Sequence, residues 1–158
     1  HRHGARFGTQ LSHGGAASTR ALLGHDPVAP SDWTREGFDP ARALTADEIE
    51  RIVDDFAAGA RRSVEAGCDF VELHGAHGYL LHQFWRRDVN RRDDAWGDPL
   101  AFPVAVSRAV RAALPATVPL LYRFSIHADA PDAPNHPVTP DSLGDFLRAL
   151  EAAGVDAW

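Results

Sequence analysis

The segment from His74 to Tyr79 reads HGAHGY and places two imidazoles and a phenol within six residues. An imidazole N–H can donate a hydrogen bond to an oxygen on which negative charge develops, and one good donor of this kind lowers a reaction barrier by about 3–4 kcal/mol. His74 and His77 are therefore candidates for polarising a carbonyl group, and the Tyr79 phenol is a candidate acid. Structural hydrogen bonds for the histidines and a packing role for the tyrosine remain the alternatives.

Two further polar side chains stand at the ends of apolar segments. Gln10 offers a hydrogen-bond donor and an acceptor on one amide group. Arg123 carries a permanent charge at the end of a segment that is otherwise apolar, where a cation is costly unless it is paired. An ion pair with Glu72 is the ordinary structural explanation for Arg123.

The histidine content supports one alternative, a metal-dependent barrel hydrolase. The chain has nine histidines, and the pairs His1/His3 and His74/His77 could supply imidazole ligands. The pattern lacks a convincing carboxylate bridge or a base for a metal-bound water, so we expect no metal site. The one cysteine, Cys68, excludes an internal disulfide and a cysteine-built zinc or iron–sulfur site in this segment, and we expect it to be a small core residue.

Three segments have the pattern of amphipathic helices that would hold these residues in place. The first begins at residues 45–48, which have the spacing of a capping box, and ends at Gly67. The second spans about residues 103–114 and the third about residues 139–153. Each of the three has one apolar face.

Short segments rich in β-forming residues alternate with these helices. We expect strands at residues 6–11, 68–73 and 118–124, with a fourth at residues 155–158. Strands that alternate with helices predict a parallel sheet with helical crossovers. Either a doubly wound sheet or part of a (β/α)8 barrel satisfies this pattern.

The positions of the polar residues favour the barrel. They collect after the strands, as Gln10 and His13, His74 and His77, and Arg123 and Ser125. In a barrel the carboxyl ends of all strands face one mouth, where residues far apart in sequence converge. No Gly-x-Gly-x-x-Gly motif follows a strand, which weakens the dinucleotide-fold alternative. We expect an α/β fold that forms part of a (β/α)8 barrel, with His13 in a structural hydrogen bond.

Six segments carry a resemblance to a known family. The strongest is residues 66–84, AGCDFVELHGAHGYLLHQF, and the others are residues 90–97 (NRRDDAWG), 10–15 (QLSHGG), 27–31 (PVAPS), 43–49 (ALTADEI) and 122–125 (YRFS). In this order and spacing the chain resembles the Old Yellow Enzyme family of FMN-dependent oxidoreductases. The resemblance extends over nearly the whole chain.

The resemblance implies an enzyme that reduces activated alkenes, such as enones, with NAD(P)H as co-substrate and FMN as cofactor. His74 and His77 would polarise the substrate carbonyl, and Tyr79 would donate the proton. Gln10 would bind the pyrimidine edge of FMN, and Arg123 would sit near the negative side of the flavin.

The resemblance also implies that residues 1–158 are a partial FMN-binding barrel domain, roughly strands 3 to 6, truncated at both ends. The principal phosphate site of such barrels follows strands 7 and 8 and would lie outside this segment. A truncated fragment without catalytic activity is therefore a second alternative. This segment does not encode an iron–sulfur cluster, so it does not indicate whether the complete protein contains one.

Three segments depart from the family pattern. Residues 98–103 are shorter and more apolar than the family's loop, and position 16 is Ala where Arg is common. Residues 126–140 form a proline-rich stretch that does not align. We expect substrate choice to depend on these loops, and we expect residues 24–43 to form a long loop over the site.

Composition narrows the class of partner. A formal charge of −6 argues against a nucleic-acid partner, because phosphate contacts need a basic surface. No segment reaches the roughly 20 apolar residues of a membrane span, and the first residues lack the apolar centre of a signal peptide. We expect a cytoplasmic protein that acts on a small molecule without a membrane partner, and homo-oligomer formation is left open.

Overall fold

The computed structural model of the chain describes residue 1, residues 3–125 and residues 140–158. Its main sheet is parallel, with the strand order β1-β4-β5. The strands are β1 (Gly8–Leu11), β4 (Phe70–Gly75) and β5 (Leu120–Phe124). Two short strands, β2 (Val28–Ala29) and β3 (Arg42–Ala43), pair separately.

Helices connect these strands. The α-helices are α1 (Arg20–Leu23), α2 (Ala46–Glu65), α3 (Leu80–Trp85), α4 (Ala101–Ala113) and α5 (Pro140–Ala152), and the short 3-10 helices are η1 (Gly15–Ala17) and η2 (Ala95–Gly97). Helix α2 connects β1 to β4 and α4 connects β4 to β5, so both connections are crossovers of the kind that parallel strands require.

The three predicted helices are present. The capping box at the start of α2 forms as expected: the Glu48 backbone N–H donates to Thr45 Oγ1 at 3.2 Å, and the Thr45 N–H donates to Glu48 Oε2 at 2.9 Å. Helix α4 begins two residues before Pro103, whose missing N–H costs nothing in a first turn. The predicted start of the third helix, Thr139, lies outside the described residues.

The strands are displaced from their expected positions by about two residues. Strand β4 runs to Gly75 rather than ending at Leu73, so His74 lies in the strand and not after it. The expected fourth strand is reduced to a single parallel bridge between Leu121 and Ala157, supported by the Tyr122 N–H, which donates to the Ala157 carbonyl at 3.0 Å.

The expected long loop at residues 24–43 is more ordered than predicted. It contains β2 and β3, and an antiparallel bridge joins Trp33 to Ala41. Ala16, Ala29 and Ala41 form a small separate core under Trp33. Ala16, at the position where Arg is common in the family, is therefore a buried member of this core.

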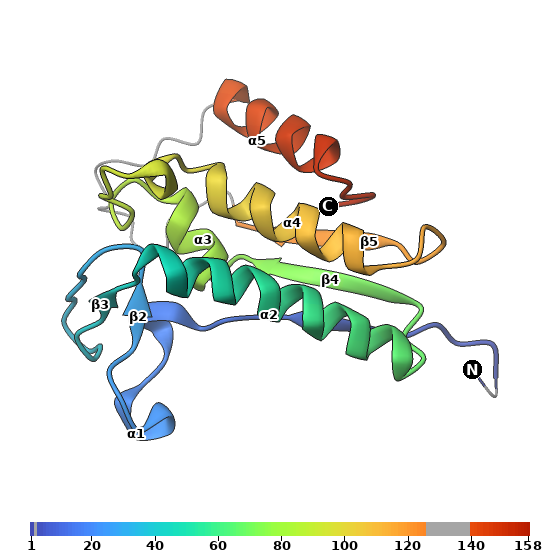
Figure 1. Cartoon of the computed structure of the whole chain (residues 1–158), viewed down its shortest axis with the longest axis horizontal. Coiled ribbons are helices and arrows are strands. Elements are labelled where there is room, and N and C mark those ends of the chain that lie inside the picture. The colour runs from blue at the N-terminus through green and yellow to red at the C-terminus, as the bar shows by residue number, and fades with distance from the viewer. Residues whose placement is uncertain (2, 126–139) are drawn as a thin grey trace.

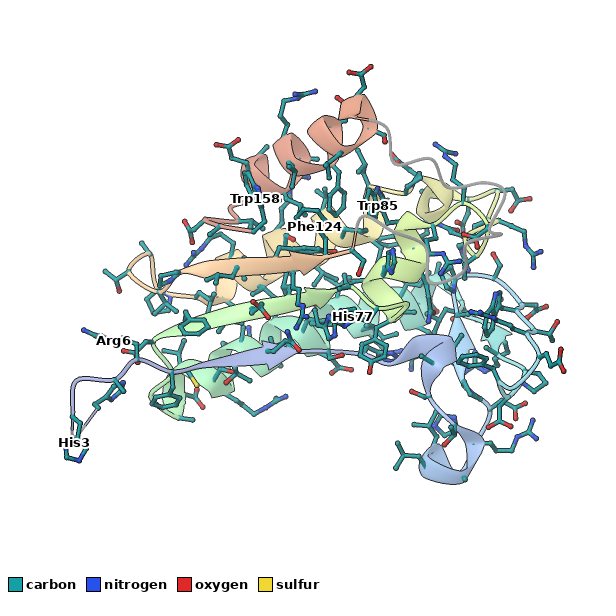
Figure 2. All side chains as sticks on the ribbon, turned by 180° about the vertical axis from the view of Figure 1, so that it is seen from behind. His3, Arg6, His77, Trp85, Phe124 and Trp158 are labelled. Carbon is teal, nitrogen blue, oxygen red and sulfur yellow. The ribbon has the colours of Figure 1, made fainter. Side chains whose placement is uncertain are left out.

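The helices cover one face of the sheet. Helices α2 and α4 lie against this face (Figure 1). Val71, Leu73 and Tyr122 are at most 1% exposed and join one continuous core with α2 and α4. Figure 2 shows the sheet from the other side, where the strands lie nearest the viewer and the helices lie behind them. No helix of the described part of the chain covers this second face, which we call the inner face.

Candidate active site

Strand register brings the candidate residues to the inner face. Gln10 on β1 is paired with Glu72 on β4, and His74 on β4 is paired with Arg123 on β5. Alternate residues of a strand point to the same face, so Glu72 and His74 share a face and their partners share it with them. Val71 and Leu73 occupy the opposite, helix-covered face. Groups from three strands are thus gathered near the carboxyl end of the sheet.

The two histidines and Tyr79 form one aromatic group. The rings of His74 and His77 are edge to face, with centroids 5.1 Å apart and an interplanar angle of 87°. The rings of His74 and Tyr79 have centroids 4.8 Å apart at 67°. His74 is only 6% exposed, whereas His77 is exposed beside the end of β4 (Figure 2). The structure therefore brings these three predicted residues together, although His74 comes from the strand itself.

An unusual turn aims His77. His77 has φ = 57° and Gly78 has φ = 76°, so two consecutive residues adopt the left-handed conformation. A non-glycine residue in this region costs of order 1–3 kcal/mol, so its surroundings must hold it there. The His77 N–H donates to Ser125 Oγ at 3.1 Å, and the Gly78 N–H donates to His82 Nδ1 at 2.9 Å. These bonds tie the turn to β5 and α3.

Arg123 does not form the ion pair with Glu72 that was the alternative, structural explanation for its position. Glu72 instead accepts a hydrogen bond from the Gln10 amide, and within the described ranges Arg123 has no carboxylate partner. Its guanidinium lies 3.5 Å from His77 Nε2 and is exposed on the inner face. The charge of Arg123 is therefore available to a ligand on that face.

Electrostatics keep His74 in its neutral form near neutral pH. Burial lowers the pKa of His74, His77 and Arg123 lower it further, and Glu72 opposes them. A neutral imidazole has one N–H and one acceptor nitrogen. The Ala76 N–H donates to His74 Nδ1 at 3.4 Å, so the N–H of His74 is on Nε2.

The same reasoning assigns His77. Arginine has only donor groups, so His77 Nε2 is the acceptor in its contact with Arg123. A neutral His77 then carries its N–H on Nδ1. Each of the two histidines can therefore present one hydrogen-bond donor to a ligand.

The expectations for His13 and Cys68 can be compared directly with the structure. His13 Nδ1 accepts a hydrogen bond from the Gly15 N–H at 3.1 Å, which confirms the predicted structural bond, and burial lowers the pKa of His13. Cys68 is half-buried just before β4, and its Sγ lies 2.9 Å from Thr9 Oγ1. Cys68 is thus only partly buried, rather than the core residue that was expected.

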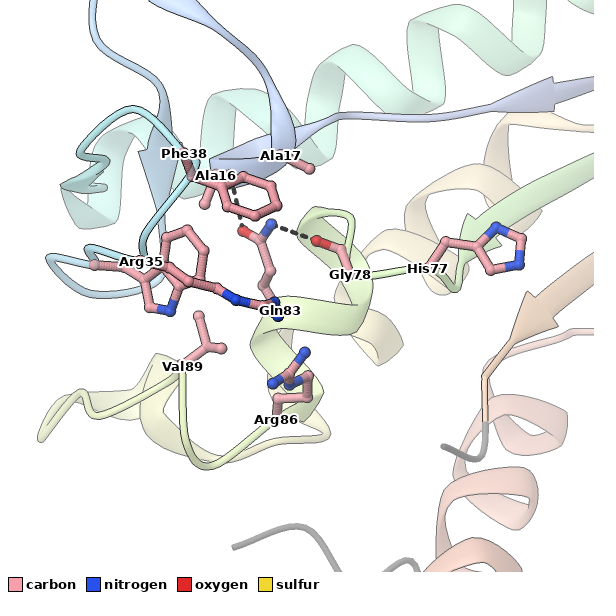
Figure 3. Close-up of a pocket in the computed structure, with 10 residues that line it drawn as sticks. Ala16, Ala17, Arg35, Phe38, His77, Gly78, Gln83, Arg86 and Val89 are labelled. Atoms are coloured by element: carbon pink, nitrogen blue, oxygen red, sulfur yellow. Dashed lines mark hydrogen bonds between the residues drawn. The ribbon is translucent and has the colours of Figure 1, made fainter. Parts of the chain in front are cut away.

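Sequence reasoning overlooked Gln83. This amide is 3% exposed on α3 and lines a pocket on the outer side of the His77–Gly78 turn, with Trp33 and Phe38 as aromatic walls (Figure 3). The His77 ring points away from this pocket. The sequence did contain a signal for it: Gln83 is the one amide in the largely apolar segment LLHQFW of α3. A polar side chain that is buried in such a segment must have hydrogen-bond partners.

The described residues also bear on the expectations about metal ions and membranes. Among the described residues, no three or more His, Cys, Asp or Glu side chains gather closely enough to hold a metal ion. No helix in the same part of the chain has the length and apolarity needed to cross a membrane. Of the proline-rich stretch expected to influence substrate choice, residues 126–139 lie outside the described ranges, and Pro140 is the first residue of α5.

Comparison with known proteins identifies close similarity over most of the chain. Residues 1–156 match the model of the NADH:flavin oxidoreductase / NADH oxidase family. A protein of Bacillus subtilis named as a probable NADH-dependent flavin oxidoreductase is 39% identical over 154 residues, which are 90% of this chain and 41% of that protein.

Solved structures agree with this match. Morphinone reductase in complex with tetrahydroNAD superposes with a TM-score of 0.85 at 29% identity, covering 98% of this chain and 48% of that one. An Old Yellow Enzyme homologue from Zymomonas mobilis superposes with a TM-score of 0.78 at 29% identity, covering 98% of this chain and 47% of that one. These matches confirm the predicted fold class, an α/β fold that forms part of a (β/α)8 barrel, and the chain spans less than half the length of each of these proteins.

Proposed function

The chain belongs to the NADH:flavin oxidoreductase / NADH oxidase family, which includes the Old Yellow Enzyme type, and on this premise we propose that it acts as an FMN-dependent reductase of activated alkenes. NAD(P)H would be the electron source. The substrate would be a small molecule whose C=C bond is conjugated to a carbonyl group. Residues 1–158 would supply part of the FMN-binding barrel, including the groups that act on the substrate.

One observation carries the proposal. The rings of His74, His77 and Tyr79 form a single group at the carboxyl end of β4. The centroid of the His74 ring lies 5.1 Å from that of His77 and 4.8 Å from that of Tyr79. In barrels this end of the strands is where active sites lie. The arrangement offers two N–H donors and one phenol to a ligand on the inner face.

The inner face has the chemistry that an isoalloxazine ring requires. The ring's pyrimidine edge presents donors and acceptors side by side, which an amide such as Gln10 matches. The exposed Arg123 guanidinium has no carboxylate partner in the described ranges, and a cation at such a position favours negative charge on the flavin. Gln10 and Arg123 are the residues we assign to FMN, and the Gln10–Glu72 bond holds the amide at the strand end.

The remaining residues act on the substrate. Bound FMN would supply the hydride that reduces the alkene. His74 and His77 would donate hydrogen bonds to the carbonyl oxygen, where negative charge grows as the β-carbon accepts the hydride. Tyr79 would give its proton to the α-carbon, which completes the addition of two hydrogens. Burial of His74 keeps its ring neutral and its single N–H available for this bond.

A visible absorption spectrum of the purified protein tests the proposal at its first step. The proposal expects the spectrum of bound oxidised flavin. Its visible absorbance should disappear when NADH is added in the absence of oxygen and return when an enone is added. Elemental analysis of the same sample distinguishes the flavin-dependent reductase from the alternative, a metal-dependent hydrolase. A protein with stoichiometric zinc and no flavin would overturn the proposal.

A further inference from the structure

Gln83 connects the two loops that carry the candidate site. Its Oε1 accepts a hydrogen bond from the Ala16 N–H at 3.2 Å, and its Nε2 donates to the Gly78 carbonyl at 2.6 Å and to the Gly14 carbonyl at 3.4 Å. Gly14 and Ala16 belong to the loop after β1, the strand of Gln10. Gly78 belongs to the turn after β4. One side chain therefore satisfies backbone groups of both loops (Figure 3).

The loop after β1 is packed directly against this amide. A Cβ atom on Gly15, whose φ is 57°, would lie 2.4 Å from Gln83 Oε1, so only glycine leaves room for the contact. The Leu80 N–H, at the start of α3, also donates to the His13 carbonyl at 2.9 Å. The start of α3 and the loop after β1 are thus joined by side-chain and backbone bonds together.

The bond to Gly78 acts on the turn that aims His77. Because His77 and Gly78 both have positive φ, the direction of the His77 ring depends on keeping this strained turn. Gln83 holds the Gly78 carbonyl on the pocket side, and the His77 ring points to the opposite side, toward the ends of β4 and β5 (Figure 3). Ser125 and His82 hold the two N–H groups of the turn, and Gln83 holds its carbonyl.

We propose that Gln83 is a positioning residue that holds the His77 turn against the loop after β1, so that the His77 N–H meets the substrate carbonyl. This inference rests on the proposed function. Gln83 lies behind the turn and does not touch the substrate. Its effect on the reaction must therefore pass through His77.

The variant Gln83→Met tests this role, because it keeps the length of the side chain and removes its hydrogen bonds. We expect kcat/KM for cyclohexenone to fall about 10-fold or more in the FMN-loaded protein, since small misplacements of a catalytic group carry large costs. Oxidation of the reduced flavin by ferricyanide, an outer-sphere acceptor that needs no carbonyl donor, should keep its wild-type rate. An unchanged kcat/KM for cyclohexenone would overturn the inference.

Asn90→Leu is the matched control. Asn90 is also a buried amide, 6% exposed, and it donates to the backbone carbonyls of Phe84 at 3.0 Å and Trp96 at 2.9 Å. It has no bond to the His77 turn among the described contacts. Asn90→Leu should lower stability while leaving the ratio of cyclohexenone to ferricyanide rates unchanged. An equal drop of that ratio in both variants would mean that Gln83 is merely structural.

A double-mutant cycle shows whether the effect passes through His77. If it does, Gln83→Met should have little further effect on kcat/KM in a His77→Ala background. Additive losses would overturn the inference even if the single variant is impaired.

A spectroscopic readout is independent of turnover. The ring C–H signals of His77 in the flavin-free chain should shift in Gln83→Met and stay at their wild-type positions in Asn90→Leu. Identical His77 signals in wild type and Gln83→Met would contradict the inference. A wild-type protein that reduces no enone overturns the proposed function and this inference with it, whereas an active wild type with an unaffected Gln83→Met overturns the inference alone.

Discussion

At the scale of single residues, the candidate site depends on two histidines that reach the same place by different routes. His74 is fixed by its strand and is nearly buried, whereas His77 is exposed and depends on a strained turn. Their acceptor nitrogens are occupied differently, His74 by the Ala76 N–H and His77 by Arg123. Each neutral ring is left with one N–H. The two rings together therefore offer two donors, and a carbonyl oxygen with two lone pairs can accept both.

Replacing either histidine should slow alkene reduction without removing the flavin. We expect His74→Ala and His77→Ala each to lower kcat for an enone by about 10²–10³-fold, the usual cost of losing one oxyanion donor. Steady-state kinetics with equal flavin content measures this loss. His3→Ala, which changes an exposed histidine near the first residue, is the control. Full activity in both site variants would contradict the assigned roles.

Tyr79→Phe should slow the half-reaction in which the alkene is protonated and leave the half-reaction in which NADH reduces the flavin unchanged. The variant keeps the ring that packs against His74 and loses the acidic hydroxyl. We expect alkene reduction to slow by about 10²–10⁴-fold, the range for a general acid, while NADH still reduces the flavin. Stopped-flow spectroscopy of the two half-reactions measures both rates. Equal slowing of both half-reactions would point to a packing role.

The lowered pKa values of His13 and His74 should make stability depend on pH. Burial is the main cause for both residues, so the unfolded chain binds protons more readily than the folded one. The free energy of unfolding should therefore fall as the pH drops below about 6.5, the unfolded value, and the effect should end below the folded pKa values. Above about pH 6.5 both histidines are neutral in the folded and the unfolded chain, so they no longer contribute to the pH dependence of stability.

Urea denaturation between about pH 8 and pH 5.5 measures this dependence. The double variant His13→Asn/His74→Asn should lose less stability over that interval than the wild type. Carboxylates with lowered pKa values, such as Asp94, act at lower pH and affect both proteins alike. The same slope in both proteins would be the contrary result.

Sequence patterns indicated which candidate residues would lie together better than they indicated the contacts these residues make. His74, His77, Tyr79 and Arg123 were identified by type and position, and the structure brings them together. The Gln10–Glu72 bond, which takes up the carboxylate that was the alternative partner of Arg123, depends on strand register. Register is a property of pairing between distant segments, which a single sequence does not display.

At the scale of elements, local signals predicted the helices well. The capping box at Thr45 and Glu48 is a short-range device, and it forms where its spacing predicts. The strands were displaced because β-propensity extends into flanking residues, whereas a strand begins where a neighbour provides hydrogen bonds. The pair β2 and β3 was missed because two-residue strands have no period to detect.

Loss of the cap should measurably destabilise α2. We expect Thr45→Ala to lower the free energy of unfolding by about 1 kcal/mol, because it leaves a first-turn N–H without its partner. Chemical denaturation measures the change. Thr117→Ala, at an exposed turn position, is the control and should stay within about 0.5 kcal/mol of wild type. Equal effects of the two substitutions would mean that the cap contributes nothing.

At the scale of the whole molecule, the sheet has one covered face and one open face. The candidate groups lie on the open inner face, and the relatives of known structure are about twice as long as the chain. The βα alternation predicted a parallel sheet with helical crossovers, because each strand and helix leaves a periodic signal. The polar residues that follow the strands then favoured the barrel over a doubly wound sheet. The expected position at strands 3 to 6 and the partial FMN site remain predictions, since they concern the barrel beyond the described elements.

The most direct test of the central claim is a single turnover of the FMN-loaded protein. The flavin is reduced with NADH in the absence of oxygen, cyclohexenone is added, and the visible absorbance of oxidised flavin is followed while the product is analysed. The account predicts that the absorbance returns in step with formation of the saturated ketone, and that a His74→Ala/His77→Ala double variant returns it far more slowly. Reduced flavin that reacts with dioxygen but never with the enone would contradict it.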